Sequence, residues 1–196
     1  ILYCSDRAGD YDIWRINPDG SRQIRLTSSS GDDIKPRMNR LGDKIVFLSN
    51  RKQGWDIWIM NIDGSNQSQV MEPSLGETRT LLWQPYVSED SNPLWDPSGM
   101  RIIFSSNPEG RDADIFIVEP HAVISVPADD RGGFYHDTTI HSPKITRLVS
   151  YEKNDLHPSW SPDGKMVAFQ SDQQGSFDIW VCTFEVETPI VRAYGV

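Results

Sequence analysis

The stretch FLSNRKQGWDIWIMNIDGS, from Phe47 to Ser65, reads as a strand, a tight loop, a second strand and a turn. Apolar and polar residues alternate on both sides of the loop, which is typical of half-buried antiparallel strands. The pair Asp63-Gly64 near its end is a strong signal for a β-hairpin. The stretch therefore predicts neighbouring antiparallel strands of one sheet.

Variations of this pattern recur along the chain, at Tyr3–Ser21, Phe104–Pro120 and Phe169–Glu185. In each copy a loop that begins Ser-Asp or Ser-Asn contains a glycine and leads to a strand that starts with an aspartate. These recurrent aspartates are Asp12, Asp56, Asp114 and Asp178. Recurrence of one local pattern predicts a repeat architecture in which each copy is a structural unit.

The later copies are each preceded by a further strand and a tight turn. The turns lie in Pro36–Gly42, Pro93–Gly99 and Pro158–Gly164, and the final glycine allows the positive φ that such a turn needs. The opening copy lacks this first strand. With a last strand such as Gln23–Thr27, each unit has four antiparallel strands at a period of roughly 40 to 60 residues, which is typical of a propeller blade.

We therefore expect an all-β fold, a β-propeller built from four-stranded antiparallel blades, with about four blades in this chain. An open stack of blades leaves exposed edges, so we expect a segment of a larger propeller of about six to eight blades. The alternative is a small four-bladed ring closed by its termini. Within a single domain, the expected parts are repeats at 1–33, 34–90, 91–155 and 156–196 and insertions at 72–91 and 120–143.

Charge and composition limit the classes of partner. The formal charge is −9 over 196 residues. An acidic surface argues against broad nucleic-acid binding, which needs clustered Lys and Arg, and against docking on anionic lipid. No apolar run approaches the roughly 20 residues that span a bilayer, so direct membrane insertion is not expected. Cys4 and Cys182 fall in predicted strands and are expected to be unpaired, buried thiols.

The sequence PSWSPDGKMVAFQSD, from Pro158 to Asp172, followed by Gly175 and Asp178-Ile-Trp180, resembles the TolB-like propeller repeat. It is also similar to repeats in the propeller domains of prolyl oligopeptidase-type and tricorn-type peptidases. The resemblance implies a periplasmic or extracellular setting. Two departures stand out, namely Met38–Leu41 where the family has Trp-Ser-Pro-Asp, and Pro108 in place of the loop arginine.

The recurrent aspartates allow two interpretations. A ring of carboxylates can bind a cation such as calcium, which needs six to eight oxygen ligands. However, residues that recur once per blade lie at equivalent places in separate blades, too far apart to share one ion. We therefore expect a structural role, in which the aspartates accept backbone N–H bonds and pair with the loop arginines, Arg7 or Arg51.

The insertion at 120–143 holds three of the four histidines, His121, His136 and His141. They are weak candidates for metal ligands because their spacing matches no metal motif. No cofactor is expected, and a metal ion at these histidines is the alternative. His157 lies at a blade entry and is expected to be structural.

The first insertion is the expected contact surface for a protein partner. It carries Leu81, Leu82, Trp83 and Tyr86 outside the repeat, and it should emerge on the same face as the loops that hold Arg7 and Arg51. The tryptophans at repeat positions, in contrast, are expected in the core. Because antiparallel strands alternate ends, the two insertions should emerge on opposite faces and should not form one site.

We expect a non-catalytic protein-binding or scaffold module within a larger envelope protein or complex, which contacts a protein partner or other domains of a longer chain. No Gly-x-Ser-x-Gly elbow occurs, and we do not expect this segment alone to be an enzyme. The enzymatic alternatives are the gating propeller of a prolyl oligopeptidase-type peptidase and a metal-dependent enzyme similar to oligogalacturonate lyase.

Overall fold

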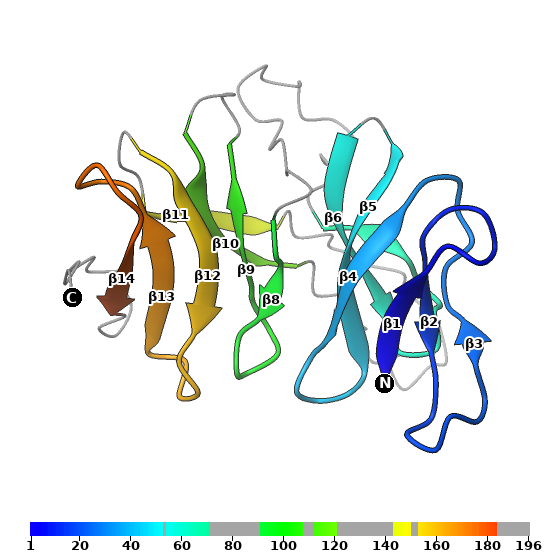
Figure 1. Cartoon of the computed structure of the whole chain (residues 1–196). Helices are drawn as coiled ribbons and strands as arrows, with labels where there is room; N and C mark the ends of the chain where they lie inside the picture. The colour runs from blue at the N-terminus through cyan, green and yellow to red at the C-terminus, as the bar shows by residue number, and fades with distance from the viewer. Residues whose placement is uncertain (53, 71–90, 108–111, 121–142, 150–152, 184–196) are drawn as a thin grey trace, which may run out of the picture.

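The computed structural model describes residues 1–52, 54–70, 91–107, 112–120, 143–149 and 153–183. These residues form four antiparallel sheets and no helix, so none of them belongs to a helix that could cross a membrane. Figure 1 shows the sheets side by side, with the turns after β4, β8 and β12 at the lower end of the view. The expected all-β blade architecture is confirmed.

Each sheet is one blade. Blade 1 consists of β1 (Leu2–Ser5), β2 (Asp12–Arg15) and β3 (Ile24–Arg25). Blade 2 consists of β4 (Asp33–Met38), β5 (Lys44–Lys52), β6 (Gly54–Asn61) and β7 (Ser68–Gln69). Blade 3 consists of β8 (Leu94–Trp95), β9 (Ile102–Ser106), β10 (Asp114–Glu119) and β11 (Lys144–Val149). Blade 4 consists of β12 (Asp155–Trp160), β13 (Met166–Ser171) and β14 (Asp178–Thr183).

The strand inventory agrees with the sequence at the N-terminal end of the chain, where blade 1 lacks the first strand of the repeat, as expected. Residues 184–196, which follow the third strand of blade 4, lie outside the described residues, as do most of both insertions. Blades 2 and 4 begin at Asp33 and Asp155, one residue before the expected repeat boundaries.

Apolar packing between neighbouring blades forms the core. In β5, Ile45 and Phe47 pack toward blade 1, whereas Val46 and Leu48 pack toward blade 3, and all four side chains are fully buried. A third cluster joins blades 3 and 4 around Phe169. Continuous apolar runs therefore occur in the inner blades because both faces of these sheets are covered.

The tight turns after the first strands have the geometry that the sequence predicts. Gly42, Gly99 and Gly164 have φ values of 76°, 76° and 71°. Each glycine N–H donates to the carbonyl three residues earlier, at 2.9–3.1 Å. His157 and its counterpart Lys35 also have positive φ, at bulges in β12 and β4. His157 therefore lies in the first strand of its blade with an exposed side chain, and its structural role stays a prediction.

The two thiols are free, as expected. Cys182 is buried between blades 3 and 4, and burial raises its pKa to about 11. Cys4 is only half-buried, because it lies in β1 of the outermost sheet.

The outer sheets expose positions that the repeat buries elsewhere. Ile13, Ile57 and Ile115 are fully buried against the following blade, whereas their counterpart Ile179 in blade 4 is 51% exposed. The face of blade 4 that points away from blade 3 is therefore of the kind that packs on another blade. This agrees with a propeller that extends beyond these four sheets.

The repeat offers a matched test of this packing. In a polypeptide of residues 1–196, Ile57→Ala should lower the free energy of unfolding by about 2–5 kcal/mol, because it leaves a cavity between blades 2 and 3. Ile179→Ala at the equivalent exposed position should cost less than about 1 kcal/mol. Urea unfolding followed by tryptophan fluorescence measures both. Equal losses would contradict the interblade assignment.

Candidate functional site

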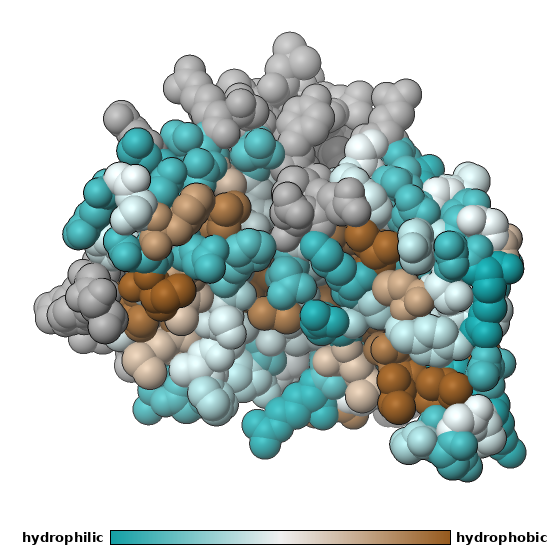
Figure 2. All heavy atoms as spheres, viewed as in Figure 1, coloured by the Kyte–Doolittle hydropathy of each residue, from teal (hydrophilic) through white to brown (hydrophobic). Residues whose placement is uncertain are grey.

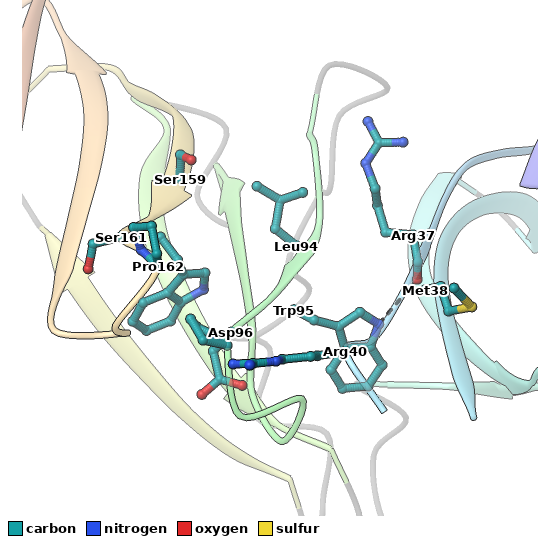
Figure 3. A pocket seen from close by; sticks show the side chains of 11 residues that line it. Arg37, Met38, Arg40, Leu94, Trp95, Asp96, Ser159, Ser161 and Pro162 are labelled. Atoms are coloured by element: carbon teal, nitrogen blue, oxygen red, sulfur yellow. Dashed lines mark hydrogen bonds between the residues drawn. The ribbon is translucent and has the colours of Figure 1, made fainter. Parts of the chain in front are cut away.

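A hollow of about 370 Å³ opens where β4, β8 and β12 end in their turns. We call it the axial hollow, and the face on which it opens the turn face. Its walls come from equivalent segments of three blades (Figure 3). The lining residues are Arg37, Met38, Arg40, Leu94, Trp95, Asp96, Pro97, Ser159, Trp160, Ser161 and Pro162.

Two tryptophans at the same repeat position form the aromatic part of the wall. Trp95 Nε1 donates to the carbonyl of Arg37 at 3.2 Å, which ties blade 3 to blade 2. The guanidinium of Arg101 lies 5.1 Å from the ring centroid of Trp160. Both indoles are only half-buried. The expectation that the repeat tryptophans are core residues holds for Trp58 and Trp180, which are 8% and 7% exposed. Trp95 and Trp160, in contrast, line the hollow.

The electrostatics of the hollow are cationic. The nearby Asp96 is buried and ion-pairs with Arg101 at 2.9 Å. Although burial opposes it, hydrogen bonds from Ser98, Arg101 and Met100 hold the pKa of Asp96 below its usual range. Arg37 and Arg40 make no ion pair with a carboxylate in the described part of the chain, and both side chains are exposed.

Exposed apolar side chains surround the hollow on the turn face. Met38 is 53% exposed, and the turn residues Leu41 and Met100 are 69% and 71% exposed. On the face that Figure 2 draws, apolar areas are small and are separated by hydrophilic surface. Methionine adapts its shape to different partners and is common at binding surfaces. Among the described residues, the lining includes serines but no His, Cys or Lys.

A departure from the repeat supplies a cationic and an apolar side chain at the hollow. Met38–Leu41 stands where the resembling family has Trp-Ser-Pro-Asp, and it replaces a proline by Arg40 and a polar residue by Leu41. Sequence reasoning noted this departure but did not assign it to a site. What it lacked was the position of the three turns relative to one another.

Buried carboxylates lie at the other end of the strands, at the seams between blades. At the seam of blades 1 and 2, Asp12 pairs with Arg25 at 2.6 Å and Asp33 pairs with Arg51 at 2.9 Å. Both carboxylates are fully buried. The Asp33 N–H donates to the carbonyl of Tyr11, which joins the two blades directly. Burial raises the pKa of Asp12, with Arg25 opposing the rise.

This arrangement corrects the predicted pairing of the strand aspartates with the loop arginines. The Arg51 guanidinium lies over the ring of Trp58 and donates to Asp33, on the first strand of its own blade. The expected pairing of Arg51 with a recurrent aspartate, such as Asp12 or Asp56, is therefore wrong. Asp33 itself was not singled out, although an aspartate three residues before Pro36 recurs three residues before Pro158.

Arg7 has a different environment from its counterpart Arg51. Its guanidinium lies 3.6 Å from the ring centroid of Trp14, donates to Gln23 Oε1 at 2.7 Å and also donates to the hydroxyl of Tyr3. In the described part of the chain, neither Arg7 nor Arg51 pairs with one of the recurrent aspartates Asp12, Asp56, Asp114 and Asp178. The role of the two arginines in partner binding stays a prediction.

The seam of blades 3 and 4 repeats the carboxylates but changes their partners. Asp114 pairs with Arg147, and the buried Asp155 donates its N–H to the carbonyl of Ala113. Gln173 stands at the repeat position of Arg51. Within the described residues, neither carboxylate oxygen of Asp155 has a hydrogen-bond partner of good geometry.

The remaining sequence candidates lie outside the described residues. They are the expected partner-binding residues Leu81, Leu82, Trp83 and Tyr86 and the expected metal ligands His121, His136 and His141. Within the described part, no group of three or more His, Cys, Asp or Glu side chains is arranged to hold a metal ion. Partner binding and metal binding at these residues stay predictions.

No family model matches this chain. A search of curated proteins finds an uncharacterized protein from Agrobacterium fabrum that is 42% identical over 48 residues, which are 24% of this chain and 16% of that protein. This match is too short to show a family.

Solved structures resemble the whole chain in fold. TolB from Acinetobacter baumannii matches with a TM-score of 0.64 at 16% identity, covering 98% of this chain and 39% of that one. A protein named as a TolB from Agrobacterium tumefaciens matches at 0.62 and 19%, covering 99% and 61%. A puromycin-hydrolyzing peptidase of Mycobacterium tuberculosis matches at 0.57 and 11%, covering 97% and 30%. The chain has a TolB-like propeller fold and spans less than two thirds of each of these structures.

The seam pairing is tested by two arginines at one repeat position. Arg51→Ala leaves Asp33 as a buried charge without its partner and should lower the free energy of unfolding by about 3–5 kcal/mol. Arg7→Ala removes an exposed stacking contact and should cost about 1 kcal/mol or less. Denaturant unfolding of both variants measures the difference. A small loss for Arg51→Ala would show that its ion pair does not stabilise the seam.

Asp155 should make stability depend on pH. Burial, Asp114 and Asp172 raise its pKa, Ser171 and Arg147 oppose the rise, and the pKa is about 6 as a result. Because the folded-state pKa exceeds the unfolded value, stability is lost as the pH rises from about 4 through about 6, by on the order of 2–3 kcal/mol.

Asp155→Asn should remove this part of the pH dependence. Urea unfolding of wild type and variant across that pH range, in a buffer of low ionic strength without Na⁺ or K⁺, measures the difference in slope. Asp33→Asn is the control, since its carboxylate already has a guanidinium partner. Parallel pH profiles for wild type and Asp155→Asn would contradict the assignment.

Proposed function

We propose that this chain is a non-catalytic protein-binding module whose partner docks on the turn face at the axial hollow. The observation that carries the proposal is the exposed Arg40 beside half-buried tryptophans and exposed apolar side chains, in an otherwise acidic chain. Binding surfaces concentrate their energy in aromatic and arginine residues that a partner can desolvate.

The chemistry of the hollow favours one kind of partner segment. Arg37 and Arg40 offer guanidinium groups to a carboxylate, and Trp95 and Trp160 offer flat apolar faces. The rim of Met38, Leu41 and Met100 can cover an apolar side chain. A peptide segment with acidic and apolar residues fits these features. The overall charge of −9 would repel such a segment elsewhere, so the cationic hollow also supports specificity.

The propeller fold supports a role as a module, and the location and context of this module are part of the proposal. TolB-like neighbours make a periplasmic or extracellular location the natural one, and a larger envelope protein or complex the natural context. The peptidase alternative keeps the same geometry, because a propeller can gate access to a separate catalytic domain. Both this alternative and the metal-dependent lyase stay predictions.

A peptide selection tests the proposal directly. Random peptides are selected on the wild-type chain, and the affinities of the selected peptides are measured by fluorescence anisotropy. We expect selected peptides to carry acidic and apolar residues. Arg40→Ala and Trp95→Phe should each weaken binding by about tenfold, which corresponds to roughly 1.4 kcal/mol. Arg22→Ala, an exposed arginine that does not line the hollow, should have no effect.

The outcomes separate the proposed site from other surfaces. Peptides that bind Arg40→Ala and wild type equally would place the binding site elsewhere, for example on the loop face predicted from Trp83. Failure to select any peptide would refute the hollow as a peptide-binding site. Circular dichroism and urea unfolding confirm that each variant is folded.

A further inference from the structure

Two equivalent seams of this fold differ in their balance of charge. At the seam of blades 1 and 2, Asp12 and Asp33 are fully buried. Arg25 pairs with the first and Arg51 with the second, at 2.6 and 2.9 Å. Two negative charges therefore face two positive charges, which is the condition under which buried carboxylates are tolerated.

The seam of blades 3 and 4 has the same two carboxylates with one guanidinium fewer. Asp114 and Asp155 take the places of Asp12 and Asp33, with 2% and 0% of their surface exposed. Arg147 pairs with Asp114. At the position of Arg51, however, the chain has the uncharged Gln173. Among the described residues, this seam therefore lacks one positive charge relative to its counterpart.

The polar atoms around Asp155 indicate where a positive charge would bind at this seam. By hydrogen-bond geometry, neither Asp155 oxygen has a partner in the described part of the chain, although the side chain is fully buried. Ser171, which is its register partner on β13, is the hydroxyl that lies close enough to lower the pKa of Asp155, but its Oγ makes no well-aligned hydrogen bond there either. Gln173 buries Nε2 without an acceptor, so this amide does not bond the carboxylate. Buried polar groups are normally paired, and a cluster without partners points to a ligand.

We propose that the seam of blades 3 and 4 binds one monovalent metal cation, Na⁺ or K⁺, on the carboxylate of Asp155. Ser171 Oγ supplies a further oxygen ligand. The Gln173 amide supplies another, once a rotation of 180° exchanges its oxygen and nitrogen. Glutamine ends two heavy atoms short of arginine, so a single small ion fits the difference between the two side chains. This proposal does not depend on the proposed function.

A divalent ion suits the seam less well. Calcium prefers six to eight oxygen ligands, usually with several carboxylates. The described part of the chain offers no group of three or more such metal-binding side chains. One added positive charge gives Asp155 the partner that Arg51 gives Asp33 at the seam of blades 1 and 2.

A proton is the competitor for the same carboxylate. The charged groups that act on Asp155 are Asp114 on β10, Asp172 in the loop after β13 and Arg147 on β11. Burial, Asp114 and Asp172 raise the pKa of Asp155 and outweigh Ser171 and Arg147, which lower it, so that the pKa is about 6. The cation should therefore bind at pH 8, where the carboxylate is ionised, and should be displaced near pH 5.

Thermal unfolding at constant ionic strength tests the site. At pH 8, replacing tetramethylammonium chloride by NaCl or KCl should raise the unfolding midpoint of the wild type by about 2–4 °C. The larger of the two shifts identifies the preferred ion. At pH 5 the dependence on the cation should disappear. A midpoint that is the same in all three salts at pH 8 would overturn the proposal.

Two reciprocal substitutions assign the effect to this seam. Gln173→Arg supplies the guanidinium that Arg51 supplies to Asp33, and it should abolish the dependence on Na⁺ or K⁺. Arg51→Gln recreates the proposed site next to Asp33 and should introduce a second dependence. If Gln173→Arg keeps the full response to the cation, the ion binds elsewhere and the proposed site is wrong.

Discussion

The structure depends on the packing of each sheet against the next through both of its faces. Ile45 and Phe47 of β5 contact blade 1, and Val46 and Leu48 contact blade 3, so one strand contributes to two cores. Burial of such side chains stabilises a fold by roughly 1.5–3 kcal/mol each. Because the sheets repeat, this packing sets equivalent residues of successive blades next to one another. The axial hollow and the charged seams both follow from that arrangement.

The repeat builds the scaffold, and the departures from it supply the chemistry. Tight turns with glycine at positive φ recur at Gly42, Gly99 and Gly164 and give three blades the same end. At that common end, Arg40 and Leu41 of blade 2 differ from their counterparts and create a cationic, apolar surface. A repeat protein can change such residues freely because the side chains in its turns contribute little to the packing between blades.

Charged side chains are buried at one end of the blades and exposed at the other. At the seams, carboxylates are removed from solvent and need a cation beside them, which Arg51 provides for Asp33. On the turn face, Arg37 and Arg40 are exposed and remain available to a partner. Desolvation accounts for the difference, since a buried charge requires a local partner whereas an exposed one is stabilised by water. At the same repeat position, Arg51 gives a buried carboxylate a positive partner, whereas Gln173 does not.

The sequence by itself determined the strand order, the turns and the blade count, because alternation and glycine placement act over a few neighbouring residues. It also marked Met38–Leu41 as unusual. Only the tertiary structure decided that Arg51 pairs with Asp33, that Trp95 borders a hollow, and that Asp155 is buried without a guanidinium. These facts depend on how strands and blades lie against one another, and a local pattern carries no information about such distances.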